Sequence, residues 1–159
     1  MLPAVIRCSL PALAACVSFL STSAHAQSLP GGAELGMTVP QLQQAVPGLR
    51  PVPHPARLAG GLVGGWAGPA IDVAGVSLAP TFFLAEGQLR RVEYLAAPGG
   101  FDALLAWGRA AWGPELASQS PEGAYATWTS GDLDAYLQQS GSTVRLVLKR
   151  RVVKDDSEL

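Results

Sequence analysis

Apolar and polar residues follow regular periods in the second half of the chain. An apolar-rich run without proline covers residues 101–112 and ends at Gly113-Pro114, which predicts a helix that stops there. Three later runs, 124–128, 133–138 and 143–153, alternate apolar and polar side chains. Such alternation is typical of strands with one buried and one solvated face. This part of the chain therefore predicts one helix followed by an antiparallel sheet of hairpins.

The first half of the chain predicts a shorter helix and two strands. Thr38 is a suitable N-cap, Gln41 stands three residues later as in a capping box, and Pro47-Gly48 ends the helix early. Strands are predicted over residues 77–85 and 89–96, because β-branched and aromatic residues there flank a Glu-Gly turn. The first half thus predicts a helix and then strands, in the same order as the second half.

Between the first helix and its strands, residues 50–69 are rich in proline and glycine. No regular element is predicted there before Trp66. A loop of this length in a compact domain is usually either functional or mobile, and both alternatives stay open. A weaker strand is predicted over residues 70–76, since Gly75 interrupts it.

These patterns together predict an α+β fold. Residues 36–153 are expected to form a single domain of two helix-plus-strands units in tandem, 36–97 and 98–153. The alternating strands of both units are predicted to make one antiparallel sheet with one buried face. Both helices are expected to pack on that face, since their apolar stripes need a partner.

The first 26 residues have the features of a secretory signal peptide. Arg7 supplies the basic start, an apolar run follows, and Ala24-His25-Ala26 is a typical cleavage pattern. The protein is therefore predicted to be periplasmic or secreted and to begin at Gln27. A lipoprotein anchored at Cys16 is the alternative, because the residues before Cys16 look like a lipobox. Residues 27–35 are expected to be a flexible N-terminal segment, and residues 154–159 an acidic tail.

Removal of the predicted signal changes the composition. Cys8 and Cys16 are the two cysteines of the chain, so the mature protein is expected to have no disulfide. Without Arg7 the 11 basic residues become 10 against 12 acidic ones, a net charge of −2. That balance gives no general attraction to nucleic acid or anionic lipid. No nucleic-acid partner and no stable membrane insertion after signal removal are expected.

Candidate catalytic and metal-binding residues are few. His54 would need a nucleophile and a carboxylate to form a triad, or further nitrogen or sulfur ligands to hold zinc, and the predicted mature chain has no second histidine or cysteine. Asp132 and Asp134 share one side of a predicted strand, as a hydrolytic carboxylate pair would, but turn formation and a solvated face explain them more simply. The protein is therefore predicted not to be an enzyme and to have no catalytic residue, metal site or cofactor.

The order of elements resembles known families. Gly36-Met37-Thr38 opening a short helix, an aromatic strand, a Glu86-Gly87 turn and a second strand resemble the small periplasmic domains of the BamE/SmpA type. Two such units in tandem are similar in outline to the β-lactamase inhibitor protein fold. This chain departs from both, because its first helix ends early and the cysteines that the inhibitor family uses as disulfides are missing. The resemblance implies a domain that binds other proteins through its open sheet face and catalyses nothing.

The predicted strand registers place a set of aromatic and charged side chains on the solvated face of the sheet. Tyrosine and arginine are frequent interface anchors, because each joins apolar area to a directional polar group. We predict that this face binds another envelope protein, as an inhibitor or immunity protein would. The alternatives are an ordinary solvated face, an accessory factor in envelope or outer-membrane assembly, and a small carboxylate-dependent hydrolase. The predicted partner-binding residues are Phe83, Arg91, Glu93, Tyr125, Tyr136 and Arg145.

Overall fold

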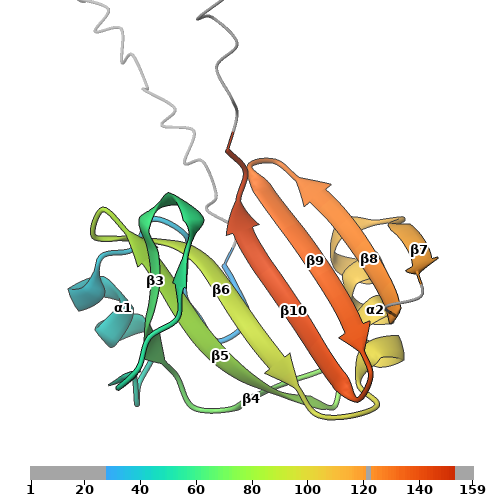
Figure 1. Cartoon of the computed structure of the whole chain (residues 1–159), viewed down its shortest axis with the longest axis horizontal. Coiled ribbons are helices and arrows are strands. Elements are labelled where there is room, and N and C mark those ends of the chain that lie inside the picture. Colours follow the sequence, from blue (N-terminus) through green and yellow to red (C-terminus); the bar gives the residue numbers. More distant parts are fainter. Residues whose placement is uncertain (1–27, 121–122, 153–159) are drawn as a thin grey trace, which may run out of the picture.

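A computed structural model describes residues 28–120 and 123–152 of the chain. The predicted signal peptide, the Cys16 alternative and the predicted acidic tail lie outside these residues. One antiparallel ten-stranded sheet dominates the described part (Figure 1). The helices are α1 (Val39–Ala45) and α2 (Phe101–Trp112), and a 3-10 turn, η1, covers Ala59–Gly61. The strands are β1 (Arg50–Pro51), β2 (Arg57–Leu58), β3 (Leu62–Ala67), β4 (Ile71–Val73), β5 (Val76–Ala85), β6 (Gln88–Ala96), β7 (Leu116–Ser120), β8 (Gly123–Ser130), β9 (Leu133–Ser140) and β10 (Thr143–Arg150).

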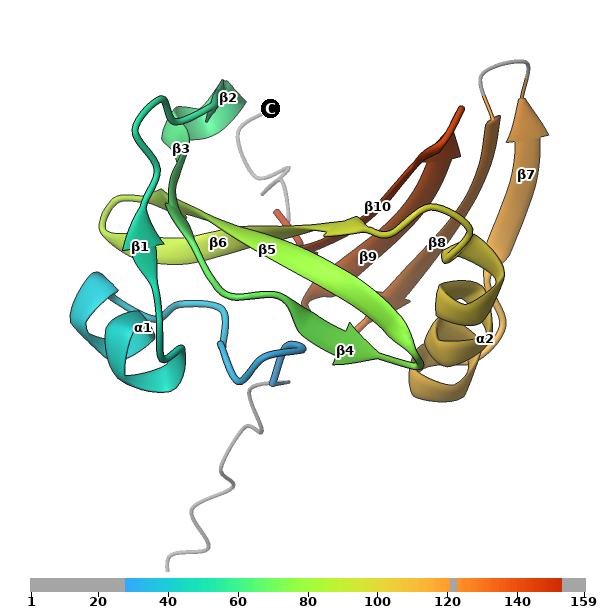
Figure 2. The same cartoon turned by 90° about the horizontal axis from the view of Figure 1, so that it is seen from below.

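The strands of the two halves of the chain meet in the middle of the sheet. The strand order is β1-β3-β5-β6-β10-β9-β8-β7, with β2 beside β3 and β4 beside β5. All pairs are antiparallel. In the described part of the chain, the first-half strands therefore join the second-half strands only through β6 and β10. Figure 2 shows that the sheet is strongly curved, with the β2-β3 end and the β7-β8 end rising on the same side.

The predicted α+β class, with both helices packed on one face of the sheet, is wrong. The fold is mainly antiparallel sheet, and its two helices have only 7 and 12 residues. They lie at opposite ends of the sheet (Figures 1 and 2) and do not form a layer over it. The physical reason is their size. α1 ends before Pro47-Gly48 and buries only Leu42, and α2 buries only Leu104 and Gly108, so most of the core comes from the strands.

Alternate positions of the long strands build this core. Residues two apart on a strand point to the same side, and residues directly opposite on neighbouring strands share that side. The side of the sheet that carries Leu78 of β5, Tyr94 of β6 and Leu146 of β10 is buried. Its other buried strand residues include Val76, Phe82, Leu89, Val92, Ala96, Ala126, Trp128, Leu133, Ala135, Leu137, Val144 and Leu148.

The segment before α1 also belongs to the core. Leu29 is 3% exposed and Ala33 is fully buried. Two backbone hydrogen bonds, from the Gly36 amide to the Leu89 carbonyl and from the Leu89 amide to the Met37 carbonyl, attach this segment to β6. Residues 28–35 therefore pack against the sheet, in contrast to the flexible segment predicted over residues 27–35. The difference arises because this segment is held by residues far along the chain, through the hydrogen bonds of Gly36 to Leu89 and of Tyr94 to Pro30, which local composition does not reveal.

The proline- and glycine-rich segment forms strands, where none was predicted before Trp66. β1, β2 and the start of β3 pair within it, and β3 pairs with β5 through an irregular step between Val63 and Trp66. Gly64 lies in that step because a Cβ atom there would stand 2.8 Å from the Phe83 ring. Glycine here permits close approach of a strand to an aromatic ring. We refer to β2, η1 and β3 together as the arm.

Burial of Tyr94 predicts a measurable pH dependence of stability. Its side chain is fully buried, its hydroxyl donates a 2.8 Å hydrogen bond to the Pro30 carbonyl, and burial raises its pKa far above the ordinary value of 10.0. Above pH 10 an unfolded Tyr94 ionises while the folded one stays neutral, so stability is lost as pH rises from there. Tyr94→Phe is expected to cost about 1 kcal/mol at pH 7 through the lost hydrogen bond.

The difference in the free energy of unfolding between wild type and Tyr94→Phe is expected to close near pH 11. Ionisation of Tyr94 in the unfolded state lowers the stability of the wild type, and not of the variant, by about 1.4 kcal/mol per pH unit above pH 10. Urea unfolding of both proteins at pH 7, 9, 10 and 11 measures this gap. A gap that stays constant over the series would contradict a neutral, buried Tyr94.

Candidate binding face

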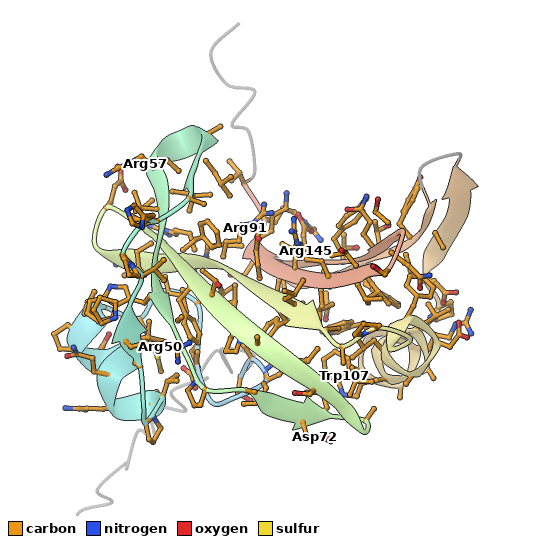
Figure 3. The ribbon with its side chains drawn as sticks, turned by 60° about the horizontal axis from the view of Figure 1, so that its bottom comes forward. Arg50, Arg57, Asp72, Arg91, Trp107 and Arg145 are labelled. Carbon is orange, nitrogen blue, oxygen red and sulfur yellow. The ribbon has the colours of Figure 1, made fainter. Side chains whose placement is uncertain are left out.

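All six predicted partner-binding residues lie on the side of the sheet opposite the core. Strand pairing arranges this side in three rows across β5, β6, β10, β9 and β8, and we call these rows the outer face. One row is Leu95, Arg145, Gln138 and Tyr125; the next is Thr81, Glu93, Val147, Tyr136 and Thr127; the third is Phe83, Arg91, Lys149, Asp134 and Thr129. Arg91 and Arg145 point to the same side of the sheet from β6 and β10 (Figure 3).

A carboxylate stands between two arginines near the centre of the outer face. Arg91 donates to Glu93 Oε1 from Nε at 3.0 Å and from Nη2 at 2.6 Å. Arg145 Nε lies 4.0 Å from Glu93 Oε2, an ion pair longer than a hydrogen bond. Glu93 therefore accepts two hydrogen bonds from Arg91 and makes only a longer ion pair with Arg145. The exposed fractions agree, at 24% for the Arg91 side chain and 50% for that of Arg145.

Positive charge exceeds negative charge on this face. The cations Arg91, Arg145 and Lys149 belong to it, and Arg151 reaches it by an Nε hydrogen bond of 3.0 Å to Asp134. The carboxylates among the described side chains of the three rows are Glu93 and Asp134. The whole chain has a net charge of −1, so the outer face is more positive than the protein as a whole.

Two tyrosines from neighbouring strands pair on the outer face. The rings of Tyr125 in β8 and Tyr136 in β9 have centroids 5.8 Å apart and an interplanar angle of 34°. Both side chains are half-buried, so each keeps part of its surface accessible to a partner. Aromatic pairs at this separation support each other, which reduces the conformational freedom that a partner would have to remove on binding.

Phe83 differs from the other five predicted residues. It lies on the predicted side of the sheet, but it is only 3% exposed because the arm crosses it at Gly64. The Arg91 guanidinium lies 6.0 Å from its ring centroid. Phe83 therefore supports the arm and Arg91, and its ring is not available as a contact for a partner.

The sequence prediction also missed residues of this face. Leu95 is 50% exposed, which is unusual for a large apolar side chain, and it stands directly opposite Arg145. Its position two residues after Glu93 was the signal that could have placed it, since residues two apart on a strand share a face. Lys149 stands two residues after Val147 and is placed by the same rule. The outer face therefore contains an exposed apolar residue beside the arginine and tyrosines.

The candidate catalytic residues are separated or paired in the structure. His54 is exposed between β1 and β2. Asp132 accepts a hydrogen bond from Arg150 Nε at 3.2 Å, and Asp134 accepts one from Arg151 Nε at 3.0 Å. Each aspartate is therefore hydrogen-bonded to a different arginine. Among residues 28–120 and 123–152, no three histidine, cysteine or acidic side chains gather as a metal site would require.

Glu115, just after α2, also has an arginine partner. Arg109 Nε donates to Glu115 Oε2 at 2.8 Å, and this hydrogen bond is the main reason why the pKa of Glu115 falls to about 2. Such a carboxyl group stays ionised at neutral pH, whereas a general acid has to hold its proton there.

Comparisons of the chain with protein-family models, curated proteins and solved structures find no match. The resemblance to the BamE/SmpA and inhibitor families therefore stays a prediction. Among the described residues, neither helix has the length and apolar character needed to cross a membrane.

Proposed function

We propose that this protein is a non-catalytic periplasmic protein that binds another envelope protein through the outer face of its sheet. The observation that carries the proposal is the combination of the half-buried Tyr125-Tyr136 pair, exposed Leu95 and exposed Arg145 on one curved face. Aromatic residues and arginine are enriched at interface centres, where they supply large area and directional polar groups.

The curvature of the sheet supports a protein partner of matching convex shape. The arm and the β7-β8 end rise on either side of β6 and β10 (Figures 2 and 3). A convex partner would touch several strands at once, as an enzyme or toxin held by an inhibitor or immunity protein does. Rigid strands also hold the side chains in fixed positions, which lowers the cost of ordering them on binding.

Tyr136→Ala is expected to weaken binding of the partner by about 2 kcal/mol, since a central tyrosine in an interface is a typical hot spot. Proteins captured from periplasmic extract by the wild type would be identified, and each would be purified and titrated calorimetrically against wild type and variant. Gln43→Ala, on the exposed side of α1, is the matched control and is expected to bind as the wild type does.

Thermal unfolding of each variant separates a loss of contact from a loss of fold, because Tyr136 is half-buried. Equal affinity of a purified partner for wild type and Tyr136→Ala would overturn the proposed role of the outer face. A hydrolase activity that is abolished by Asp134→Ala would overturn the non-catalytic part of the proposal.

A further inference from the structure

The outer face has a small polar cavity at the end of the β9-β10 hairpin. Its volume is about 240 Å³, and it is lined by Gln138, Ser140, Thr143 and Arg145. The register explains why these four side chains meet: Thr143 stands opposite Ser140, and Arg145 stands opposite Gln138. The cavity therefore belongs to two rigid, paired strands and to the same side of the sheet as the tyrosine pair.

The lining of this cavity suits an anion. Arg145 brings a permanent positive charge, the Gln138 amide can donate, and the two hydroxyls can donate or accept. No acidic side chain is among the four lining residues. A carboxylate in this position would receive the charge-assisted hydrogen bonds that an arginine gives most strongly.

Arg145 is the arginine of the outer face that is available for such a ligand. The Glu93 carboxylate already receives two hydrogen bonds from Arg91, and it is 4.0 Å from Arg145 Nε. Within the described part of the chain, Arg145 makes no other ion pair. Its half-exposed guanidinium thus keeps donors for a partner, while Glu93 limits the directions in which it can turn.

Apolar and aromatic groups flank this cation along the same row. Leu95 lies opposite Arg145 on β6 and is 50% exposed, and Tyr125 lies opposite Gln138 on β8. A ligand that contacted only the Arg145 guanidinium would leave Leu95 exposed to water. A protein segment with an acidic residue beside an apolar one would contact both Arg145 and Leu95. The excess of positive charge on the outer face also favours a partner segment with an acidic residue.

We infer that the cavity at Arg145 receives an aspartate or glutamate side chain of the protein partner, with an apolar residue of that partner packed on Leu95. The inference rests on the proposed function, because it names what the outer face recognises. It makes Arg145 the specificity-determining residue of that face, and Tyr136 a contact that does not depend on the partner's charge.

Selection of displayed random peptides against the immobilised protein tests this without knowledge of the natural partner. Peptides that bind wild type are expected to be enriched in aspartate or glutamate next to an apolar residue. Replacement of the acidic residue in a selected peptide by its amide, and separately Arg145→Gln in the protein, are each expected to weaken binding at least about tenfold. Arg50→Gln is the matched control, since Arg50 lies in β1, which three strands separate from β10 in the sheet order.

The outcomes distinguish the inference from the proposed function. Peptides whose binding is lost in Tyr136→Ala but is unchanged in Arg145→Gln, with no acidic enrichment, would overturn the inference and leave the proposed function standing. Selected peptides that bind wild type, Tyr136→Ala and Arg145→Gln equally, or a selection that yields no specific peptide, would count against both. Weakening by Arg50→Gln as large as that by Arg145→Gln would show attraction to overall charge and would also overturn the Arg145 cavity as the site.

Discussion

Replacement of Trp128 by alanine is expected to lower the free energy of unfolding by about 3–5 kcal/mol, the usual cost of removing a large buried aromatic side chain. Trp128 is 4% exposed and lies on the core side of β8. Its ring fits against Gly108 of α2 so closely that a Cβ atom on Gly108 would stand 2.7 Å from it. The loss of Trp128 therefore leaves a cavity between α2 and the sheet.

Trp128 also anchors the end of α2. Its Nε1 donates a 3.0 Å hydrogen bond to the Gly113 carbonyl, directly after the helix. The Trp112 ring stands 5.5 Å from the Trp128 ring, and Trp107 stands 5.0 Å from Trp112. Removal of Trp128 thus breaks the link between α2 and β8 in addition to removing apolar area.

Chemical unfolding followed by circular dichroism measures this effect. Tyr125→Ala is the matched control, because Tyr125 lies on the same strand but on the outer face, half-buried rather than buried. Trp128→Phe is expected to fall between wild type and Trp128→Ala, since it keeps a ring in the core and loses the hydrogen bond to Gly113. A loss in Trp128→Ala no larger than that in Tyr125→Ala would contradict the role of Trp128 as the anchor of α2.

Local pattern was sufficient to predict the elements that carry strong periodicity. The helix predicted over residues 101–112 is α2, and the strands predicted over 77–85, 89–96 and 133–138 correspond closely to β5, β6 and β9. Alternation also assigned Tyr125 to the side opposite the core, because the direction of a side chain follows from its parity on the strand. These features depend on residues close in sequence.

The remaining parts of the fold depend on distant residues. β7 was not predicted, because Leu116–Ser120 has no apolar alternation and is held by its pairing with β8. The arm was not predicted, because its local sequence is rich in glycine, and Gly64 fits a strand here only because the Phe83 ring of β5 occupies the space of a side chain. The burial of Leu29 likewise depends on a sheet formed much later in the chain. The helices were assigned too large a share of the core for the same reason.

The sequence predicted the side of the sheet on which the candidate residues lie, but not which of their side chains meet. Parity placed Arg91, Glu93 and Arg145 on one face, and strand pairing then brought their charges together. The long pairing of β6 with β10 sets which of them meet, and no local pattern predicts that pairing. Phe83 has the correct parity as well, yet the arm covers it.

Phe83→Ala is expected to destabilise the protein by about 3–5 kcal/mol, and its effect on partner binding is expected to follow from this loss. Phe83 is 3% exposed on a side of the sheet where its neighbours Arg91 and Lys149 reach solvent. The pairings of β5 with β3 and with β6 both shift register beside it, so the sheet bends at this point. The ring fills the space between that bend and the arm.

A double-mutant cycle with Gly64 tests this packing directly. Gly64→Ala alone is expected to cost about 1–3 kcal/mol, because its methyl group would meet the Phe83 ring at 2.8 Å. In the Phe83→Ala background the same methyl group enters the space that the ring has left, so the cost is expected to vanish or change sign. Thr81→Ala, on the same strand and face but partly exposed, is the control and should show no such coupling with Gly64→Ala. Additive effects of Gly64→Ala and Phe83→Ala would mean that the arm does not rest on Phe83.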